Sequence, residues 1–221
     1  MIRGTFIASL RDIVMRQEQN KAWCVHLLAA AMIFVAGCGE DPARPEQPQG
    51  QQPAAVELTW AEQVEAVRAG TATEIHVTKT AIQDADLELL RGVEALESLI
   101  IEESTISDDG LGIINQLPEL TALNLGSSKI TDNGLGQLAS LNKMSLLRLG
   151  ADGLTNEGLR VIGKLETVRF LILVNAGIDD AGLKHLHRMS QLESLYVLGS
   201  NVTEAGLADL RDAIPELHVH W

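Results

Sequence analysis

Two pairs of histidines are the side chains of this chain that come nearest to a metal-binding pattern. His218 and His220 stand two residues apart, so both would point to one side of a strand. His185 and His187 form a second pair, on a predicted helix. Two imidazoles can begin a zinc site, but such a site takes three or four protein ligands. Neither pair has a third ligand at a suitable spacing, so we expect no metal site.

Serine, histidine and aspartate, the residues of a hydrolase triad, are also present. A nucleophilic serine of an α/β-hydrolase stands on a sharp turn within its own short glycine motif, and no comparable catalytic motif occurs here. The glycines recur at a fixed interval instead, and none of them builds a phosphate-binding loop. We predict that the protein is not an enzyme and that it binds no cofactor.

Cys38 stands in a sequence that indicates a covalent modification. It directly follows the apolar run AWCVHLLAAAMIFVAG at 22–37, which is preceded by the basic residues Arg16 and Lys21. About 18 or more apolar residues are needed to cross a membrane, and a shorter run is typical of a signal-peptide core. The sequence therefore predicts an export signal at the N-terminus.

The end of this run, Val35-Ala36-Gly37-Cys38, resembles the lipobox of bacterial lipoproteins, in which an aliphatic and two small residues precede a cysteine. The resemblance implies that residues 1–37 are a signal peptide and that Cys38 becomes the lipidated first residue. The protein would then be held to a membrane of the cell envelope, on its extracytoplasmic side. Two alternatives stay open: an uncleaved hydrophobic anchor with a chance cysteine, and a start of translation at Met15 rather than Met1.

The residues after Cys38 predict a spacer and then a short helix. The segment EDPARPEQPQGQQPAA at 40–55 is rich in proline and glutamine and has no apolar periodicity, as in disordered tethers. We assign 38–56 to the lipidated cysteine and this tether. In 57–71, Thr59 and Glu62 have the spacing of a capping box, which predicts a helix that caps the following domain.

The rest of the chain is built from a repeat of 24 residues. Each copy holds an aliphatic residue, a polar residue, an acidic or amide residue, any residue, glycine and leucine, except that Asp86 replaces the glycine in the first copy. Self-similarity at a fixed period marks a solenoid, in which each unit buries its apolar face against its neighbours. The motif begins at Ile82, Ile106, Ile130, Leu154, Ile178 and Val202.

Each unit also contains two apolar residues that are two positions apart and would point inward from a strand. The polar residue of the motif is a predicted helix N-cap, and the acidic residue after it suits the positive end of the helix dipole. Glycine inside a helix costs about 1 kcal/mol relative to alanine, so its recurrence indicates a close approach between backbones of stacked turns. The inward pairs are Ile75/Val77, Leu99/Ile101, Leu123/Leu125, Leu147/Leu149, Leu171/Leu173, Leu195/Val197 and Val219/Trp221.

The consensus L-x-x-L-x-L-x-x-S-x-I-T-D-x-G-L resembles the leucine-rich repeat, especially the subtype of F-box leucine-rich proteins and many bacterial relatives. The resemblance covers 72–221. It implies an α/β fold, a curved solenoid with parallel strands on its concave face, short helices on its convex face and a C-terminal strand as cap. No F-box motif precedes the repeats, so a ubiquitin-ligase role is not expected.

The outward strand positions would form the concave face of this solenoid. Its central column would be His76, Ile100, Asn124, Arg148, Ile172, Tyr196 and His220. An apolar cluster with one arginine stands out in the later repeats, and exposed clusters of this kind are typical of interfaces. The predicted partner-binding residues are Leu146, Arg148, Phe170, Ile172, Val174, Tyr196 and Leu198.

The composition narrows the class of partner. A net charge of −13 argues against nucleic acid as a partner, because binding to phosphate backbones needs a basic surface. We therefore expect another protein or a peptide as the partner, and a role as a non-catalytic interaction or scaffold module. The alternative is a glycan or cell-wall polymer, which would favour aromatic and polar residues. Only Tyr196 and Phe170 supply aromatic six-membered rings to the predicted face.

Overall fold

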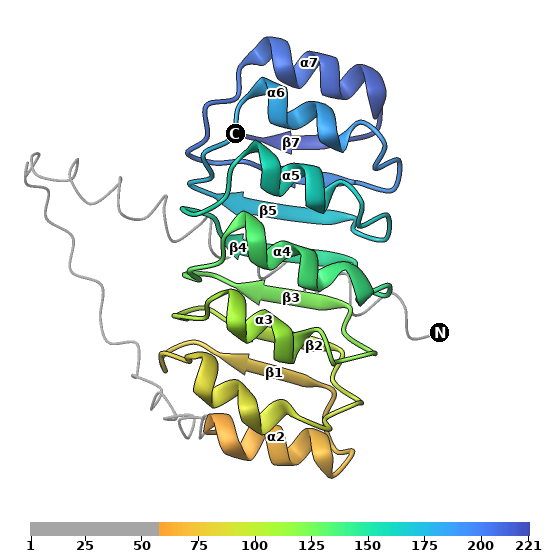
Figure 1. The fold of residues 1–221 in the computed structure, drawn as a ribbon. Helices are drawn as coiled ribbons and strands as arrows, with labels where there is room; N and C mark the ends of the chain where they lie inside the picture. The colour runs from red at the N-terminus through yellow and green to blue at the C-terminus, as the bar shows by residue number, and fades with distance from the viewer. Residues whose placement is uncertain (1–57) are drawn as a thin grey trace, which may run out of the picture. The chain divides into compact units, whose positions relative to one another are not determined.

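The computed structural model describes residues 58–221. In this part of the chain, seven parallel strands form one sheet in the order β1 to β7, with a helical segment between consecutive strands (Figure 1). The predicted signal peptide, Cys38 and the tether lie outside the described residues. The strands are β1 Glu74–Val77, β2 Ser98–Ile101, β3 Ala122–Leu125, β4 Leu146–Gly150, β5 Phe170–Val174, β6 Ser194–Tyr196 and β7 His218–His220.

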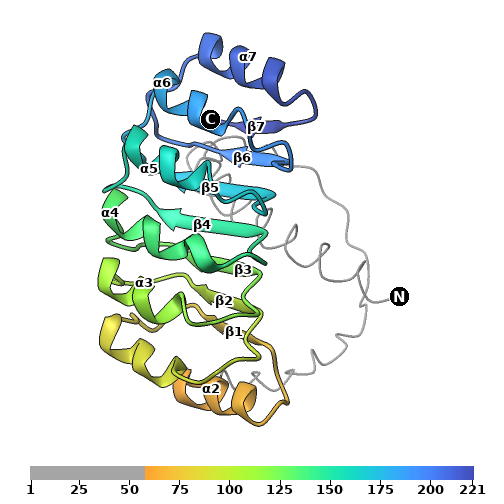
Figure 2. The same cartoon turned by 45° about the vertical axis from the view of Figure 1, so that its right-hand side comes forward.

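The helices between the strands lie on one side of the sheet, which leaves its other side to the outward strand positions (Figure 2). Most of them are short, and two continue as 3-10 helices. None of the described helices is long and apolar enough to cross a membrane. The α-helices are α2 Trp60–Arg68, α3 Asp108–Ile114, α4 Asp132–Leu135, α5 Asn156–Ile162, α6 Asp180–Leu183 and α7 Glu204–Ala213, and the 3-10 helices are η1 Asp84–Leu90, η2 Gly136–Ser140 and η3 Lys184–Leu186.

The register of the sheet follows the sequence period. Leu123 pairs with Leu99 on one side and with Leu147 on the other, each 24 residues away, and the shift is the same at every strand pair. Side chains of one type therefore stack into ladders along the solenoid. The predicted inward residues are fully or nearly buried from Ile75 to Val197, which confirms the strand assignment.

Helix α2 covers the first end of the sheet. Thr59 caps it, and the Glu62 carboxylate accepts the Thr59 backbone N–H at 2.8 Å, which confirms the predicted capping box. Trp60, Val64 and Val67 form its buried stripe. The indole N–H of Trp60 donates to the carbonyl of Asp86 at 3.1 Å, which joins the helix to the first repeat.

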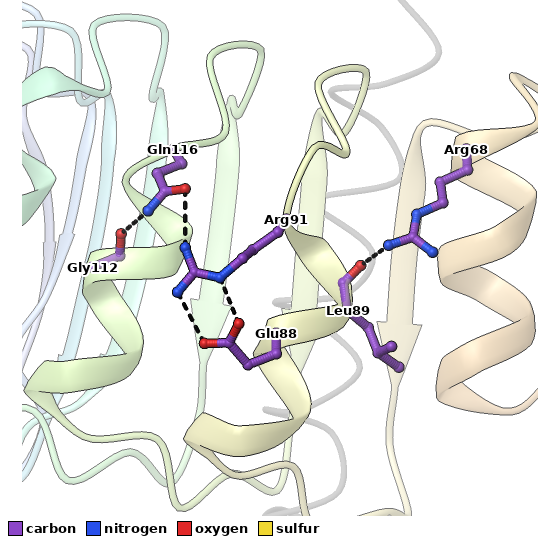
Figure 3. Close-up of polar contacts among 6 residues, drawn as sticks. All are labelled: Arg68, Glu88, Leu89, Arg91, Gly112 and Gln116. Carbon is purple, nitrogen blue, oxygen red and sulfur yellow. Dashed lines mark hydrogen bonds and ion pairs between the residues drawn. The ribbon is translucent and has the colours of Figure 1, made fainter.

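Exposed polar contacts continue this connection on the helical side of the solenoid (Figure 3). Arg68 donates from Nη2 to the carbonyl of Leu89 at 2.6 Å. Arg91 binds the Glu88 carboxylate through two bonds of 2.5 and 2.9 Å, and its Nη1 reaches Gln116 of the next repeat at 3.4 Å. Exposed ion pairs contribute little to the free energy of unfolding, so we expect these contacts mainly to order the side chains that make them.

The C-terminal end is covered less completely than the sequence predicts. Val219 is half-buried and continues the inward ladder, but Trp221 keeps 51 % of its surface exposed. The strand β7 ends at His220, and the Trp221 ring lies 5.3 Å from the guanidinium carbon of Arg211 in α7. Trp221 therefore does not take the inward position that its pairing with Val219 predicts, because its ring packs beside Arg211 of α7 instead.

The helix N-caps form a second ladder, which joins neighbouring repeats. Ser107, Thr131, Thr155, Asp179 and Thr203 cap their helices, as predicted. Each cap is also held by the acidic or amide residue of the preceding repeat. The Asp132 carboxylate accepts the backbone N–H of Thr155 at 2.9 Å and its hydroxyl at 2.6 Å. The pairs are Asp84–Ser107, Asp108–Thr131, Asp132–Thr155, Asn156–Asp179 and Asp180–Thr203.

This cap ladder explains the repeated glycines and corrects the sequence interpretation. A methyl group at Gly158 would lie 2.4 Å from Oδ1 of Asp132, and the other motif glycines face the equivalent carboxylate or amide at 2.2 to 2.4 Å. The close approach is thus to a side chain of the preceding repeat, not to its backbone. The first repeat has no upstream partner in the ladder, and Asp86 stands there in place of glycine.

One pair of the cap ladder has its carboxylate on the cap residue and not on the partner from the preceding repeat. Where the cap is Asp179, its partner is Asn156, whose Nδ2 donates to Asp179 Oδ1 at 2.8 Å and whose Oδ1 accepts the Asp179 backbone N–H at 3.1 Å. The Asn156 amide, together with the backbone N–H of Ala181, lowers the pKa of Asp179. This bonding therefore stabilises the fold above the ordinary pKa near 3.8, and the stabilisation is lost as pH falls through the lowered pKa of the folded state.

Asn156→Asp is expected to destabilise the protein at neutral pH, because it removes the amide donor and sets two carboxylates against each other. The penalty should shrink as pH falls, since one of the facing carboxyl groups then takes up a proton. The double variant Asn156→Asp/Asp179→Thr rebuilds the Asp–Thr pair of the other repeats and should recover stability at neutral pH. Urea unfolding of both variants at several pH values tests this, and equal stability of the single and double variants would contradict it.

Candidate partner-binding face

The register of β4, β5 and β6 places most of the predicted binding residues side by side on the concave face, the side of the sheet turned away from the helices. Leu146 pairs with Phe170 in one column. Arg148 pairs with Ile172, and Ile172 with Tyr196, in the central column. In the third column, Val174 pairs with Gly150, and Leu198 lies beyond it, where its carbonyl accepts the N–H of Asn175.

The burial of these residues differs from the prediction of an exposed patch. Leu146 and Ile172 are buried, each with 6 % of its surface exposed, while Phe170 and Val174 are half-buried. Arg148, Tyr196 and Leu198 are half-buried as well. Neighbours in one column of a sheet stand about 4.8 Å apart, so a side chain flanked on both sides exposes little more than its tip.

Arg148 is the charged residue of this cluster. Burial lowers the pKa of its guanidinium, and the charge of the Glu102 carboxylate partly offsets that effect. Glu102 in turn lies 3.5 Å from the His76 imidazole, across the first two repeats. The concave face thus carries the His76–Glu102 pair at its first two repeats and the rings of Phe170 and Tyr196 in its later repeats, with Arg148 between them.

Aromatic rings mark the C-terminal part of the face. The rings of Tyr196 and His220 stack with their centres 4.1 Å apart and their planes 6° apart, as their register in β6 and β7 dictates. The guanidinium carbon of Arg169 lies 6.0 Å from the Phe170 ring and is held there by Glu193, which accepts from Arg169 Nε at 2.9 Å. Both rings therefore have a fixed neighbour, which favours rigid contact surfaces.

The histidine pairs occupy separate places. His218 and His220 are exposed on the same strand, and His220 stacks on Tyr196. His185 belongs to η3, and His187 follows it with its Nε2 atom 3.5 Å from the Asp209 carboxylate. Among residues 58–221, the side chains of histidine, cysteine, aspartate and glutamate do not gather in groups of three that would hold a metal ion.

Asn124 is a residue of this face that the predicted binding set leaves out. It stands in the central column between Ile100 and Arg148, and only 5 % of its surface is exposed. Its Oδ1 atom accepts no hydrogen bond within the described part of the chain. An asparagine at an outward strand position is unremarkable in a sequence, so its position there gives no sign of this burial.

Comparison with solved structures establishes the fold. An internalin (inlF) from Listeria monocytogenes is similar over 71 % of this chain, with 19 % identity and a TM-score of 0.53. Internalin C2 from the same species covers 71 % at 18 % identity and a TM-score of 0.49, and a leucine-rich-repeat protein of Leptospira interrogans covers 72 % at 19 % and 0.47. These alignments cover 49, 80 and 39 % of the three relatives, in that order.

The described residues thus form a leucine-rich-repeat solenoid of the α/β class, which confirms the predicted fold. The chain spans about half the length of the inlF internalin. No protein-family model matches the sequence, and no curated protein matches it. The similarity to the internalins concerns the fold alone, at this level of identity.

Proposed function

We propose that this protein is a non-catalytic interaction module that binds another protein through the concave face of its solenoid. The observation that carries the proposal is the register of β4 to β6, which gathers Phe170, Ile172 and Tyr196 into one continuous surface around Arg148. Aromatic residues and arginine are the residues most enriched at energetically important positions of protein interfaces.

A glycan or cell-wall polymer is the second candidate. Sugar rings pack against open aromatic faces, and the Tyr196–His220 stack supplies two adjacent rings. In that stack, however, each ring covers one face of the other, and the remaining residues of the cluster are aliphatic apart from Phe170 and Arg148. This composition favours a protein partner.

We further propose that lipidation of Cys38 holds the module to the extracytoplasmic side of a membrane, and that residues 38–56 act as its tether. The support is the Val35-Ala36-Gly37-Cys38 sequence after a short apolar run. Metabolic labelling with an alkyne-bearing fatty acid tests the anchor. The wild-type protein should be labelled and recovered with membranes, whereas Cys38→Ser should lose the label, and labelling of the variant would contradict the proposal.

Phe170→Ala is expected to weaken partner binding by about 2 kcal/mol, or roughly thirtyfold in Kd, as for an anchor residue at the centre of an interface. In cells, a photoreactive phenylalanine analogue at position 196 should give a discrete crosslinked product that Phe170→Ala removes. The matched control carries the same analogue at the exposed Lys184 position on the helical side. Products from position 184 but none from position 196 would place the interface on the helical side and overturn the proposal.

A further inference from the structure

We propose that Asn124 binds the main chain of an extended segment of the partner, in the middle of the concave face. The inference rests on the proposed function and adds the chemistry of one contact to it. Ala122 and Gly126 lie two residues to either side of Asn124 on the same face of the sheet, and Gly150 is adjacent to Gly126.

These small residues have a structural explanation of their own. A methyl group at Gly126 would lie 2.6 Å from the carbonyl oxygen of Glu102, and one at Gly150 would lie 2.5 Å from that of Gly126. The glycines are therefore required by the close packing of the strand ends. By themselves they indicate no ligand.

Within residues 58–221, the unpaired carboxamide oxygen of Asn124 is the independent observation that points to a ligand. The inward neighbours Leu123 and Leu125 are fully buried in the core, so the alternation of the strand directs Asn124 to the concave face. Its Oδ1 atom accepts no hydrogen bond among the described residues, and an acceptor that is buried without a donor destabilises a fold. A position that served packing alone would favour an apolar side chain, like its neighbour Ile100.

The chemistry of the carboxamide identifies the kind of group that fits. Asparagine offers one acceptor and two donors, and it can therefore pair with both the N–H and the C=O of a peptide group. Leu146 and Arg148 of β4 are next along the face, and the apolar residues of β5 lie beyond them for the side chains of the same segment. A cationic group fits less well, because Arg148 is the next residue of the column.

The test uses linear peptides selected from a random display library on the full chain. For a selected peptide, Asn124→Ala should raise Kd about tenfold, as expected for the loss of one or two hydrogen bonds. It should not lower the melting temperature, because the variant no longer buries an unpaired acceptor. Methylation of one amide nitrogen of the peptide should weaken binding to the wild type and have little effect on the variant. The matched control is Asn142→Ala, at an exposed loop position, which should change neither property.

Three results would overturn the inference. An unchanged Kd for Asn124→Ala would show that the side chain does not contact the peptide. Tighter binding by Asn124→Asp would indicate a cationic ligand instead of a main chain. Failure to select any peptide, while the probe at position 196 still gives a protein crosslink, would overturn the main-chain contact and leave the proposed function standing. If no peptide is selected and position 196 gives no crosslink, both the inference and the proposed function are overturned.

Discussion

Replacing Gly158 by alanine is expected to lower the free energy of unfolding by about 2–4 kcal/mol, although alanine is ordinarily the better helix former by about 1 kcal/mol. The new methyl group would lie 2.4 Å from Oδ1 of Asp132 and would force this carboxylate away. The carboxylate would then lose its bonds to the backbone N–H and the hydroxyl of Thr155. Hydrogen bonds to a charged group contribute about 1.5–3 kcal/mol each.

Gly136→Ala is the matched control for this substitution. Gly136 has helical backbone angles, is exposed, and has no atom within 4 Å of the position that a methyl group would take. The control should therefore stabilise the protein by up to about 1 kcal/mol. In an Asp132→Ala background the clash partner is gone, so the further change Gly158→Ala should become neutral or favourable. Chemical unfolding of the four variants measures these differences, and an equal effect at both glycines would contradict the cap-ladder explanation.

The motif glycines show which features of the fold can be predicted from a single sequence and which cannot. The period of 24 residues predicts the strands, their register and the N-caps, because stacked identical units must place equivalent residues side by side. The reason for the glycine is not visible in the period. It depends on where the Asp132 carboxylate of one repeat lies relative to Gly158 of the next, and two acceptable explanations, backbone or side-chain proximity, predict the same sequence pattern.

The candidate site was predictable to a smaller extent. The alternation of the strands correctly brings Arg148, Ile172 and Tyr196 together, since that needs only the register. The burial of Leu146, Ile172 and Asn124 was not predictable, because it depends on how far neighbouring side chains lean over each other. The predicted inward position of Trp221 is wrong for a related reason: the strand register alone cannot show that the ring packs beside Arg211.

Leu147→Ala is expected to cost about 3–5 kcal/mol of unfolding free energy. Leu147 is fully buried at the middle of the sheet, between Leu123 and Leu171, so truncation leaves a cavity that rigid neighbouring ladders cannot close. Leu89→Ala is the matched control, because Leu89 is 41 % exposed and its loss should change stability by no more than about 0.5 kcal/mol. Similar losses for both variants in urea unfolding would contradict a continuous central core.

The same substitution near the end of the ladder should act differently, because each repeat contacts only its neighbours. Leu195 is also fully buried, but only the half-buried Val219 continues the ladder beyond it. Leu195→Ala should therefore release β6 and β7 locally, with faster hydrogen exchange there and unchanged protection of β2. Leu147→Ala has repeats on both sides and should weaken protection in β3 and β5 together. Faster exchange across the whole sheet in Leu195→Ala would mean that the repeats unfold as one unit, so that position along the solenoid would not set the cost.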